Sequence, residues 1–327
     1  MATTFYPANL QWFGIAKETT YGTPVAAPTI WIPVKSPKWD PQIAQNKDDA
    51  LRGSMGKTFQ QVPDMRYSKV TYQTFPYMDS VYVHFLALLG NPDTITGSAD
   101  PYTHKTSLYN GSGTNAAQPP SYTLFYADAA GQVRQVPGAV MGSLKYAVKA
   151  GALVGIDVEW TGLFGAAITP PTNTPTALVP WPSWNSTFTI GGVAATNYSD
   201  ITLTYKRATE PIPTITGTQD PYAIYGGEVD VTGDMTAVFP GESAGDLAAF
   251  IAGTQQALVV KTAPAGDATH SLTLTHSKVA YESAAPEGTN KWMEIKSKVE
   301  ALTNPTDGLS GQSPVQAVFT TATSTAF

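Results

Sequence analysis

The stretch VDVTGDMTAVFPGESAGDLAAFIAG, residues 229–253, sets the fold class of this 327-residue chain. Its first half alternates between apolar and polar side chains as far as Phe239. Strict alternation is typical of a half-buried antiparallel strand, with apolar side chains inward and polar side chains outward. The same pattern recurs along the chain, for example over residues 154–160, 201–205 and 292–301. The sequence therefore predicts a mainly β protein.

Two stretches, residues 79–89 and 243–252, carry apolar side chains at helical spacing and are predicted as short helices. A glycine follows each of them, and glycine commonly ends a helix. Asp79 and Ser243 stand at the two starts, where a short polar side chain accepts hydrogen bonds from the first free amides. We therefore expect these two residues to be the N-caps.

The two predicted helices belong to a larger internal similarity. A Phe-Pro dipeptide precedes each helix, beginning at Phe75 and at Phe239. Before each dipeptide we expect a strand, a long polar loop and a second strand, with the loops over residues 40–65 and 208–227. Similarity in a fixed order indicates repeated structural units. The sequence therefore predicts a duplicated β module with one short helix in each copy.

A region rich in proline separates the two predicted copies. Residues 166–190 also carry few charges, so we expect a stiff, extended linker there. This places a first β domain, with an N-terminal arm, at residues 1–165, and a second, with a C-terminal tail, at residues 191–327. Alternation over residues 315–319 predicts a late strand or a segment that docks on a neighbour.

The composition excludes several classes of function. Charged residues make up 13% of the chain and the net charge is −6, which argues against a protein that grips nucleic acid through its phosphates. Cysteine is absent, so neither a disulfide nor a thiolate site is available. The N-terminus shows no signal-peptide pattern, and no apolar run approaches the roughly 20 residues of a membrane-spanning helix. We expect a soluble protein, made in a cytosol, with no membrane contact.

Residues 241–245, GESAG, match the G-x-S-x-G nucleophile elbow of α/β-hydrolases. A Ser243 nucleophile needs a histidine base and an orienting carboxylate, and Asp267, His270 and His276 follow it in the chain. That short interval contains no recognisable βα unit, and the flanking strands are predicted to be antiparallel. The first copy makes the same corner without an elbow. We therefore interpret the motif as a structural turn and predict that the protein is not an enzyme.

Other chemically suggestive residues are also interpreted as structural. None of the four histidines has the spacing of a metal-ligand pair. His84 falls within an apolar pattern, which predicts a packed core residue. The oxygen-rich stretches at residues 46–49 and 93–100 lack the spacing of a calcium loop. We predict no cofactor and no bound metal.

The N-terminal phrase GIAKETTYGTP, residues 14–24, is followed by IPV at residues 32–34. Both resemble the opening of the tail tube, or major tail, proteins of long flexible-tailed (siphovirus-type) bacteriophages, many of which have a similar G-x-x-x-E-x-x-Y-G-T-P turn before an extended strand. The run GGEVDVTGDMT, residues 226–236, fits the second half of the same family. The resemblance covers most of the chain in order, through short motifs built of turn residues.

The resemblance implies a structural virion protein with a β-sandwich or barrel-like tail-tube fold and a flanking helix. In this family six copies of the fold form a ring, and rings stack into a hollow tube. The tube encloses the tape-measure protein, meets tail-end proteins, and conducts DNA to the host through its lumen without specific binding. A duplicated fold then implies a trimeric, pseudo-hexameric ring, in a tail assembled from protein made in the host bacterial cytoplasm.

Two sets of residues are candidates for these contacts, and neither set is catalytic. The polar faces of the strands carry carboxylates that would line an acidic lumen and repel DNA: Asp157, Glu159, Asp230, Asp234, Glu294 and Glu300. The long polar loop after the first strand carries mixed charges that would reach the next ring: Lys47, Asp48, Asp49 and Arg52.

An alternative function is a β-sandwich module for carbohydrate binding or surface adhesion. In that case Trp181 and Trp184 of the predicted linker would stack on sugar. Such a module usually carries a secretion signal, which the sequence lacks, so the tail tube is the favoured prediction.

Overall fold

The computed structural model describes residues 5–111, 117–215, 217–241, 245–267, 269–289 and 291–327. It is mainly β, as the sequence predicts, with two α-helices among these residues. The N-terminal half contains η1 (Ala8–Leu10), β1 (Trp12–Lys17), β2 (Ile30–Ile32), β3 (Val34–Asp48), β4 (Gln60–Thr74), α1 (Val81–Leu89), β5 (Thr94–Thr96), β6 (Tyr102–Ser107), β7 (Tyr122–Ala127), β8 (Val133–Lys149), β9 (Gly155–Gly162) and β10 (Ala166–Ile168). The C-terminal half contains η2 (Ser183–Asn185), β11 (Ser186–Ile190), β12 (Val193–Ala194), β13 (Tyr198–Ile212), β14 (Ala223–Val238), α2 (Gly245–Ala252), β15 (Gln256–Thr262), β16 (Ser271–Gly288), β17 (Met293–Ala301) and β18 (Gln316–Thr321).

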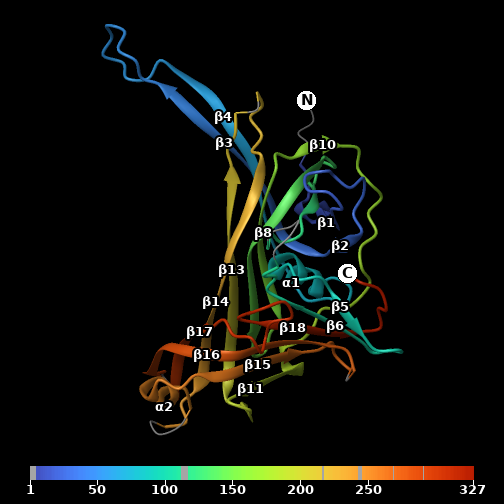
Figure 1. The fold of residues 1–327 in the computed structure, drawn as a ribbon, viewed down its shortest axis with the longest axis vertical. Coiled ribbons are helices and arrows are strands. Elements are labelled where there is room, and N and C mark those ends of the chain that lie inside the picture. The colour runs from blue at the N-terminus through green and yellow to red at the C-terminus, as the bar shows by residue number, and fades with distance from the viewer. Residues whose placement is uncertain (1–4, 112–116, 216, 242–244, 268, 290) are drawn as a thin grey trace.

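Eight long strands form one sheet, the long sheet, in the order β3-β4-β9-β8-β13-β14-β17-β16 (Figure 1). Every neighbouring pair in it is antiparallel. The sheet consists of two groups of four strands, β3-β4-β9-β8 and β13-β14-β17-β16. They meet where β8 pairs with β13, from Lys149 opposite Asp200 to Ser143 opposite Lys206. We call this contact the β8–β13 seam.

Each group of four strands continues into a second sheet through one of its members. The first part of β8 pairs with β7 and β10, and this sheet has the order β2-β1-β7-β8-β10. The first part of β16 pairs with β15 and β18, in the order β12-β11-β15-β16-β18. The hairpin of β5 and β6 extends the latter sheet by pairing with β18. The same strand order therefore occurs twice in the chain.

Irregularities in the ladders also fall at matching places in the two halves. The register shift between Met141 and Ser143 in β8 matches that between Tyr281 and Ser283 in β16. The shift between Tyr122 and Leu124 in β7 matches that between Gln256 and Leu258 in β15. The shift between Ile43 and Gln45 in β3 matches that between Arg207 and Thr209 in β13. A bulge adds one residue to a strand and increases its local twist. Three of the four register shifts in each half therefore match, while the fourth, between Lys35 and Lys38 in β3 and between Tyr198 and Asp200 in β13, does not coincide.

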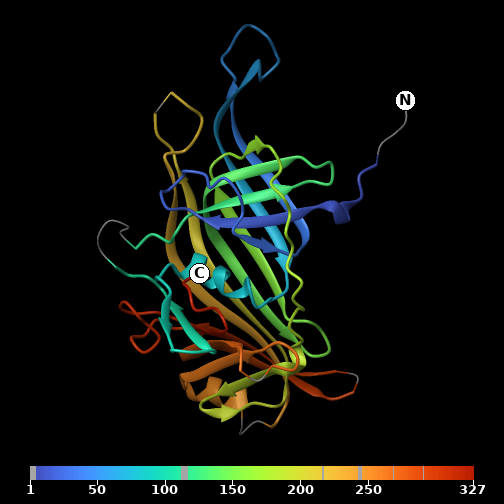
Figure 2. The same cartoon turned by 90° about the vertical axis from the view of Figure 1, so that its right-hand side faces the viewer.

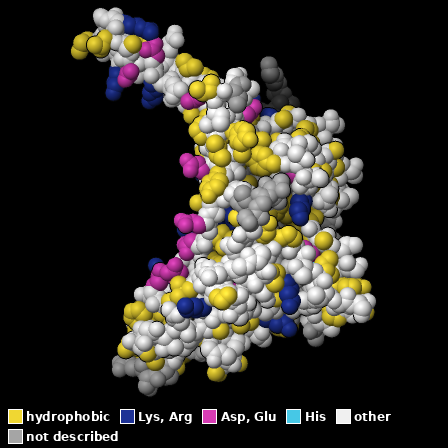
Figure 3. Space-filling model, viewed as in Figure 1, with side chains coloured by type: hydrophobic (Ala, Val, Ile, Leu, Met, Phe, Trp, Pro, Cys, Tyr) yellow, Lys and Arg dark blue, Asp and Glu magenta, His cyan; other side chains and the backbone are white. Residues whose placement is uncertain are grey.

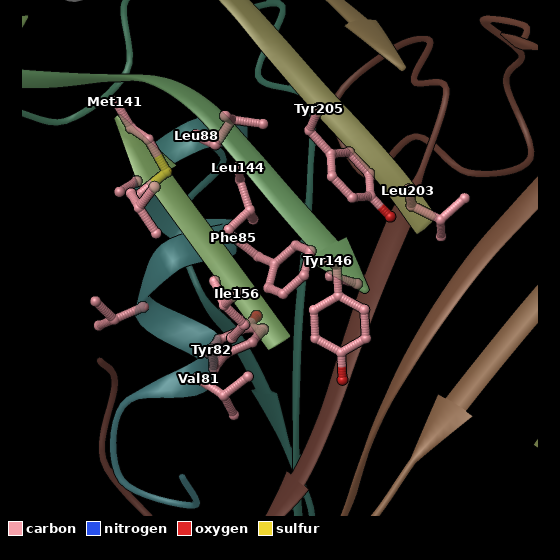
Figure 4. Packing of buried hydrophobic residues seen from close by; sticks show 14 of the residues in the cluster. Val81, Tyr82, Phe85, Leu88, Met141, Leu144, Tyr146, Ile156, Leu203 and Tyr205 are labelled. Carbon is pink, nitrogen blue, oxygen red and sulfur yellow. The ribbon is translucent and has the colours of Figure 1, made fainter. Parts of the chain in front are cut away.

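Helix α1 lies against the inner face of the long sheet and fills the core there (Figure 4). All nine of its residues are buried. The ring of Phe85 packs on Tyr146 of β8 and Tyr205 of β13, with centroid separations of 6.0 and 5.7 Å. Full burial of one such apolar side chain is worth roughly 1.5–3 kcal/mol. Since β8 and β13 belong to different groups of strands, this helix holds the two halves together.

The molecule is elongated, and its two ends differ (Figures 1 and 2). At one end the hairpin of β3 and β4 projects beyond the body as an arm, with the tip of the β13–β14 hairpin near its base. Arg66 of β4 joins the two hairpins through an ion pair with Asp220, Nε to Oδ1 2.9 Å. Helix α2 and the β16–β17 hairpin lie at the opposite end.

Both predicted helices are present, as α1 and α2, but the predicted cap at Asp79 is wrong. Ser80 is the N-cap residue of α1 and makes no side-chain hydrogen bond to the helix. The reason is that the preceding turn already binds the first amide, since Val81 N donates to the Tyr77 carbonyl at 3.0 Å. The other predicted cap, Ser243, lies outside the described residues.

The predicted polar loops over residues 40–65 and 208–227 are much shorter than expected. Strand β3 extends to Asp48 and β4 begins at Gln60, while β13 extends to Ile212 and β14 begins at Ala223. These strand ends project past the core, so they have no apolar face to bury and no alternation to reveal them. The predicted late strand is present as β18 and pairs with β6 and β16 of the same chain.

Candidate assembly surface

One face of the long sheet is exposed and polar, while the other packs on α1 and the second sheets. Registers across the sheet place all the predicted carboxylates on the polar face: Asp157 and Glu159 on β9, Asp230 and Asp234 on β14, and Glu294 and Glu300 on β17. In the view of Figure 3, acidic side chains follow the concave outline of the molecule. The alternation in the sequence therefore located a single surface.

Lysines alternate with these carboxylates. The register places Lys145 opposite Asp157, Lys206 opposite Asp230 and Lys298 opposite Asp234. Lys69 Nζ lies 3.4 Å from a carboxylate oxygen of Glu159. Exposed ion pairs contribute only about 0–1 kcal/mol each to stability. Their main effect is therefore on the electrostatic potential of the surface. The polar face presents a mixture of charges with no uniformly acidic area.

Both edges of the long sheet are open. Among the described residues, β3 pairs with β4 alone, and residues 280–288 of β16 pair with β17 alone. An edge strand presents unpaired N–H and C=O groups, and these are a template for pairing with a further strand. The lone chain therefore exposes two different edges that are able to extend the sheet.

The two helices differ in how far they are covered. In α2 only Asp246 and Ala249 are buried, and Phe250 and Ile251 are 39% and 73% exposed. Asp246 attaches this helix to the sheet by accepting hydrogen bonds from Ser297 Oγ at 2.6 Å, Tyr281 OH at 3.0 Å and the Tyr198 hydroxyl. Helix α2 is thus anchored through one side and bare on another.

Helix α1 is covered at its C-terminal end by Arg207 of β13. The guanidinium donates to the carbonyls of Leu88 and Leu89 at 2.8 and 3.4 Å and to that of Gly227 at 3.0 Å. Arg207 is 3% exposed, and burial lowers its pKa to about 10, which still leaves it charged at neutral pH. A cation at a helix C-terminus interacts favourably with the helix dipole. No described residue plays this role at α2.

The four predicted inter-ring residues lie in the outer part of the arm. Lys47 and Asp48 end β3, and Asp49 and Arg52 follow in the tip. Asp48 forms an ion pair with Arg52, whose guanidinium lies 4.9 Å from the centroid of the Phe59 ring. Asp48 and Arg52 therefore shape the tip.

The arm tip also exposes apolar side chains that the sequence analysis did not single out. Leu51 and Met55 are fully exposed. On a projecting tip, these side chains are available for contact with another protein.

The N-terminal phrase is fixed to the body by Glu18, which is 8% exposed. One carboxylate oxygen accepts from Gly22 N at 2.8 Å and Ser121 Oγ at 2.7 Å. The other accepts from Gly138 N and Thr123 Oγ1, both at 2.8 Å. These donors belong to the N-terminal turn, β8, β7 and the residue preceding β7. Glu18 therefore holds three separate segments in one place.

Tyr21 of the same phrase reaches the C-terminal half. Its hydroxyl accepts a hydrogen bond from Ile224 N of β14 at 2.6 Å. Burial is the main cause that raises the Tyr21 pKa to about 12, so the phenol is neutral. The glutamate and tyrosine of the phrase GIAKETTYGTP thus position the N-terminal segment on both halves.

Three histidines are buried, and two of them, His84 and His276, have similar surroundings in the core, one in each half. His84 Nε2 lies 3.1 Å from the Tyr72 hydroxyl, and His276 Nε2 lies 3.1 Å from the Tyr205 hydroxyl. In both rings Nδ1 lies 3.0 Å from a backbone carbonyl, so Nδ1–H donates and Nε2 accepts. Burial lowers the pKa of both imidazoles to about 4. Both are neutral, packed side chains, as predicted for His84.

The two histidines of the hypothetical hydrolase are bonded to other groups in the structure. Ser243 lies outside the described residues, and both ring nitrogens of His276 are bonded within the core. His270 lies between two carboxylates, with Nε2 2.8 Å from Asp100 Oδ1 and Nδ1 paired with Asp267; the hydrogen bond to Asp100 is the main cause that raises its pKa. The strand before the corner, β14, belongs to an antiparallel sheet, whereas a nucleophile elbow belongs to an α/β-hydrolase sheet.

Other predicted ligand sites find little support. Trp181 is fully buried and stacks on Phe319, with ring centroids 6.5 Å apart, so the expectation that it stacks on sugar is wrong. Trp184 is 73% exposed. Within the described residues, no group of three or more His, Asp or Glu side chains is arranged to hold a metal ion. In that same part of the chain, neither helix has the length and apolar character to cross a membrane.

A long antiparallel sheet with two open edges, a bare helix and a projecting arm offers several surfaces for contact with other proteins. The comparison with protein families agrees: the family described as phage tail tube protein matches residues 9–319, nearly the whole chain. The chain belongs to this family, which is a family of structural proteins of the phage tail. Among curated proteins, the search finds no match.

The residues that hold the two halves together were not predicted from the sequence. Glu18 and Tyr21 were quoted for the resemblance, but nothing in the phrase showed which segments they bind. Arg207 interrupts the polar–apolar alternation of β13 at an inward position, and a charged residue at such a position indicates a buried partner. In the sequence, this break in the alternation was the one indication that Arg207 binds a buried partner.

Proposed function

We propose that three copies of this chain close into a ring of six β modules and that rings stack into the hollow phage tail tube through which DNA reaches the host. The long sheet carries this proposal, because its two groups of four strands have the same order, equivalent second sheets and three matching register shifts. We infer one duplicated module, with most of the first copy within residues 1–165 and most of the second within residues 191–327. The segment 166–190 between them begins with β10 and ends with β11, and these two strands complete the two second sheets.

Ring closure follows from the difference between the two edges of the long sheet. Within the chain, β8 of the first module pairs with β13 of the second. The equivalent contact between chains joins β16 of one copy to β3 of the next. A head-to-tail contact of this kind closes into a ring when its rotation divides the circle, and otherwise forms a filament. Six modules, supplied two to a chain, give a trimeric, pseudo-hexameric ring.

The polar face of the long sheet lines the lumen in this arrangement. Asp157, Glu159, Asp230, Asp234, Glu294 and Glu300 then face the passing DNA, together with the lysines paired to them. Strong DNA binding requires a basic surface that displaces counterions from phosphates. A mixed, net-acidic wall does not hold the polymer, so DNA and the tape-measure protein pass through without specific contacts.

The arm supplies the contact between rings. It projects at one end of the long axis, while α2 and the β16–β17 hairpin lie at the other (Figure 1). Leu51 and Met55 at the tip are fully exposed in the lone chain. Lys47 and Asp49 lie on either side of Asp48, which forms the ion pair with Arg52. Their charges select the position at which the arm docks on the next ring. At the ends of the tube the same surfaces meet the tail-end proteins.

Native mass spectrometry and negative-stain imaging of the purified protein test the ring. The expected result is a particle of three chain masses with a central hole, together with stacks of such particles. Six chain masses in one ring would contradict the duplicated module. A protein that remains monomeric at every concentration and salt condition would contradict the assembly altogether.

Replacing Leu51 and Met55 by serine tests the arm. Because both side chains are exposed in the lone chain, the variant is expected to fold normally and to form three-chain rings that no longer stack into tubes. Ser54→Ala, in the same tip, is the matched control and keeps stacking. Tubes of unchanged length from the double variant, measured by negative stain, would remove the arm from the contact between rings.

A further inference from the structure

We propose that residues 38–42 of β3 pair antiparallel with residues 283–287 of β16 in a second copy of the chain, in the register that places Lys38 opposite Glu287. This proposal rests on the ring described above. It specifies the contact between chains residue by residue, and it derives that contact from the β8–β13 seam inside the chain.

The position along β16 follows from β8. The bulge between Met141 and Ser143 in β8 matches the bulge between Tyr281 and Ser283 in β16, so Ser143 corresponds to Ser283. The register shifts of β7 and β15 give the same correspondence independently. Ala139 of β8 and Val279 of β16 pair with the residues at which these shifts begin, so Ala139 corresponds to Val279. Both comparisons relate the two strands by the same offset.

The position along β3 follows from β13 in the same way. The register shift after Ile43 in β3, whose extra residue lies in β4, matches the shift after Arg207 in β13, whose extra residue lies in β14, so Gln42 corresponds to Lys206. Within the seam, Lys206 lies opposite Ser143. Transferring this pair to the open edges places Gln42 opposite Ser283 of the second copy, and the other pairs follow as far as Lys38 opposite Glu287, where a bulge in β3 between Lys35 and Lys38 ends the regular ladder.

The bare side of α2 agrees with this placement. Gly90 and Gly253 directly follow the two helices, so Leu88 of α1, whose carbonyl Arg207 binds, corresponds to Ile251 of α2. Arg207 itself corresponds to Ile43 of β3. The proposed contact therefore brings Ile43, 44% exposed, to Ile251, 73% exposed, in the second copy. A polar contact within the chain is replaced by an apolar contact between chains.

The prolines of the two edges also select this register. An antiparallel ladder uses the N–H groups of only every second residue on a given side. In the proposed register Pro41 and Pro286 fall in one set of alternate pairs, so the other set bonds without losing a donor. If the register were shifted by one residue, each set of alternate pairs would contain a proline. Either set would then lack one N–H donor.

The side chains distinguish this register from a shift by two residues. On the inner face, half-buried Trp39 meets Pro286, flanked by the small Ala284 and Gly288. On the polar face, Lys38 meets Glu287. Each already has a partner of opposite charge in its own chain, Asp40 at 3.2 Å for Lys38 and Lys296 for Glu287, so the pairing forms a row of four alternating charges. Opposite charges on directly opposed residues stabilise a strand pair.

Introduced cysteines test the register, since the chain has none of its own. Asp40→Cys and Ala285→Cys lie opposite each other in the proposed pairing, and in assembled rings they are expected to form a disulfide between copies. Asp40→Cys with Ser283→Cys, and Asp40→Cys with Glu287→Cys, are matched controls that lie two residues out of register, about 7–8 Å apart on the diagonal. Mixing single-cysteine proteins limits the product to a covalent dimer, which is read on a non-reducing gel.

The expected yield of dimer is at least fivefold higher for the opposed pair than for either control. A higher yield from a control assigns another register and overturns the proposal. Three-chain rings without cross-linking in any combination place the contact elsewhere and also overturn it, while the proposed function stands. A protein that never assembles contradicts both.

Charge reversal gives a second measurement. Lys38→Glu places like charges opposite each other and is expected to raise the protein concentration for half-assembly several-fold at low salt. Glu287→Lys has the same effect. The two changes together are expected to recover part of the assembly, because the opposed charges are again of opposite sign while each reversed side chain lies beside a like charge of its own chain, Asp40 or Lys296. Failure of the double variant to recover, with both single variants impaired, would show that the two side chains do not meet.

Discussion

Between pH 7 and pH 4 the free energy of unfolding of the chain is expected to fall by about 3 kcal/mol for each of two buried histidines, His84 and His276. Burial lowers the pKa of each folded imidazole to about 4 from an ordinary 6.5. As the pH falls through 6.5, the unfolded chain therefore takes up protons that the folded chain excludes. Most of this stability is lost by pH 4, and the loss levels off about one pH unit lower, where the folded imidazoles are protonated as well.

Urea unfolding at a series of pH values measures this effect, with the variant His84→Gln, His276→Gln as its control. Glutamine keeps a donor and an acceptor for the carbonyl and the tyrosine hydroxyl but has no proton to gain. The control is expected to be less stable at pH 7 and to lose much less stability on acidification. An equally steep loss in the control would assign the acid sensitivity to carboxylates, and an NMR titration midpoint above pH 6 for either folded imidazole would contradict the burial argument.

Replacing Glu18 by glutamine is expected to lower the free energy of unfolding by about 3 kcal/mol, although the two side chains have nearly the same shape. Each carboxylate oxygen accepts one backbone N–H, from Gly22 or Gly138, and one hydroxyl hydrogen. An amide nitrogen in place of either oxygen would face a backbone N–H that cannot turn away. One buried donor is then left without an acceptor, and the charge that strengthened all four bonds is gone.

Asp246→Asn is the matched control for this prediction. Asp246 is also a buried carboxylate, 3% exposed, but the donors that reach it are the hydroxyls of Tyr198, Tyr281 and Ser297. Hydroxyl groups rotate and can accept as well as donate, so we expect this change to cost about 1–2 kcal/mol. Chemical denaturation of both variants gives the comparison, and equal losses would mean that the two backbone donors have no special part in anchoring the N-terminal turn.

Strand identity and the polar face could be predicted from the sequence because they depend on a local pattern. Alternation along β9, β14 and β17 placed Asp157, Asp230 and Glu294 on the outward side, and the structure places them on one face. The two short helices were predictable for the same reason. Each of these strands and helices packs one apolar side on the core, and that side appears in the sequence as a periodic pattern.

The arm and the contacts between halves could not be predicted, for a physical reason. The outer parts of β3 and β4 pair with each other in solvent, so neither face needs to be apolar and no periodicity forms. The bonds of Arg207 to α1, and of Glu18 to β7 and β8, join residues more than one hundred positions apart. Their partners are backbone groups and hydroxyls, which leave no mark in the sequence.

The position of the β8–β13 seam inside a single chain has a consequence for how a ring comes together. Strands tethered in one molecule meet at an effective concentration on the order of millimolar, however dilute the protein is. Folding thus completes half of the junctions before any two molecules collide. Association removes translational and rotational freedom from each molecule that joins the ring. A ring of this chain therefore requires that loss from three molecules, where a ring of single modules would require it from six. On dilution, a ring is expected to open at the β3–β16 junctions and to release pairs of modules that stay joined.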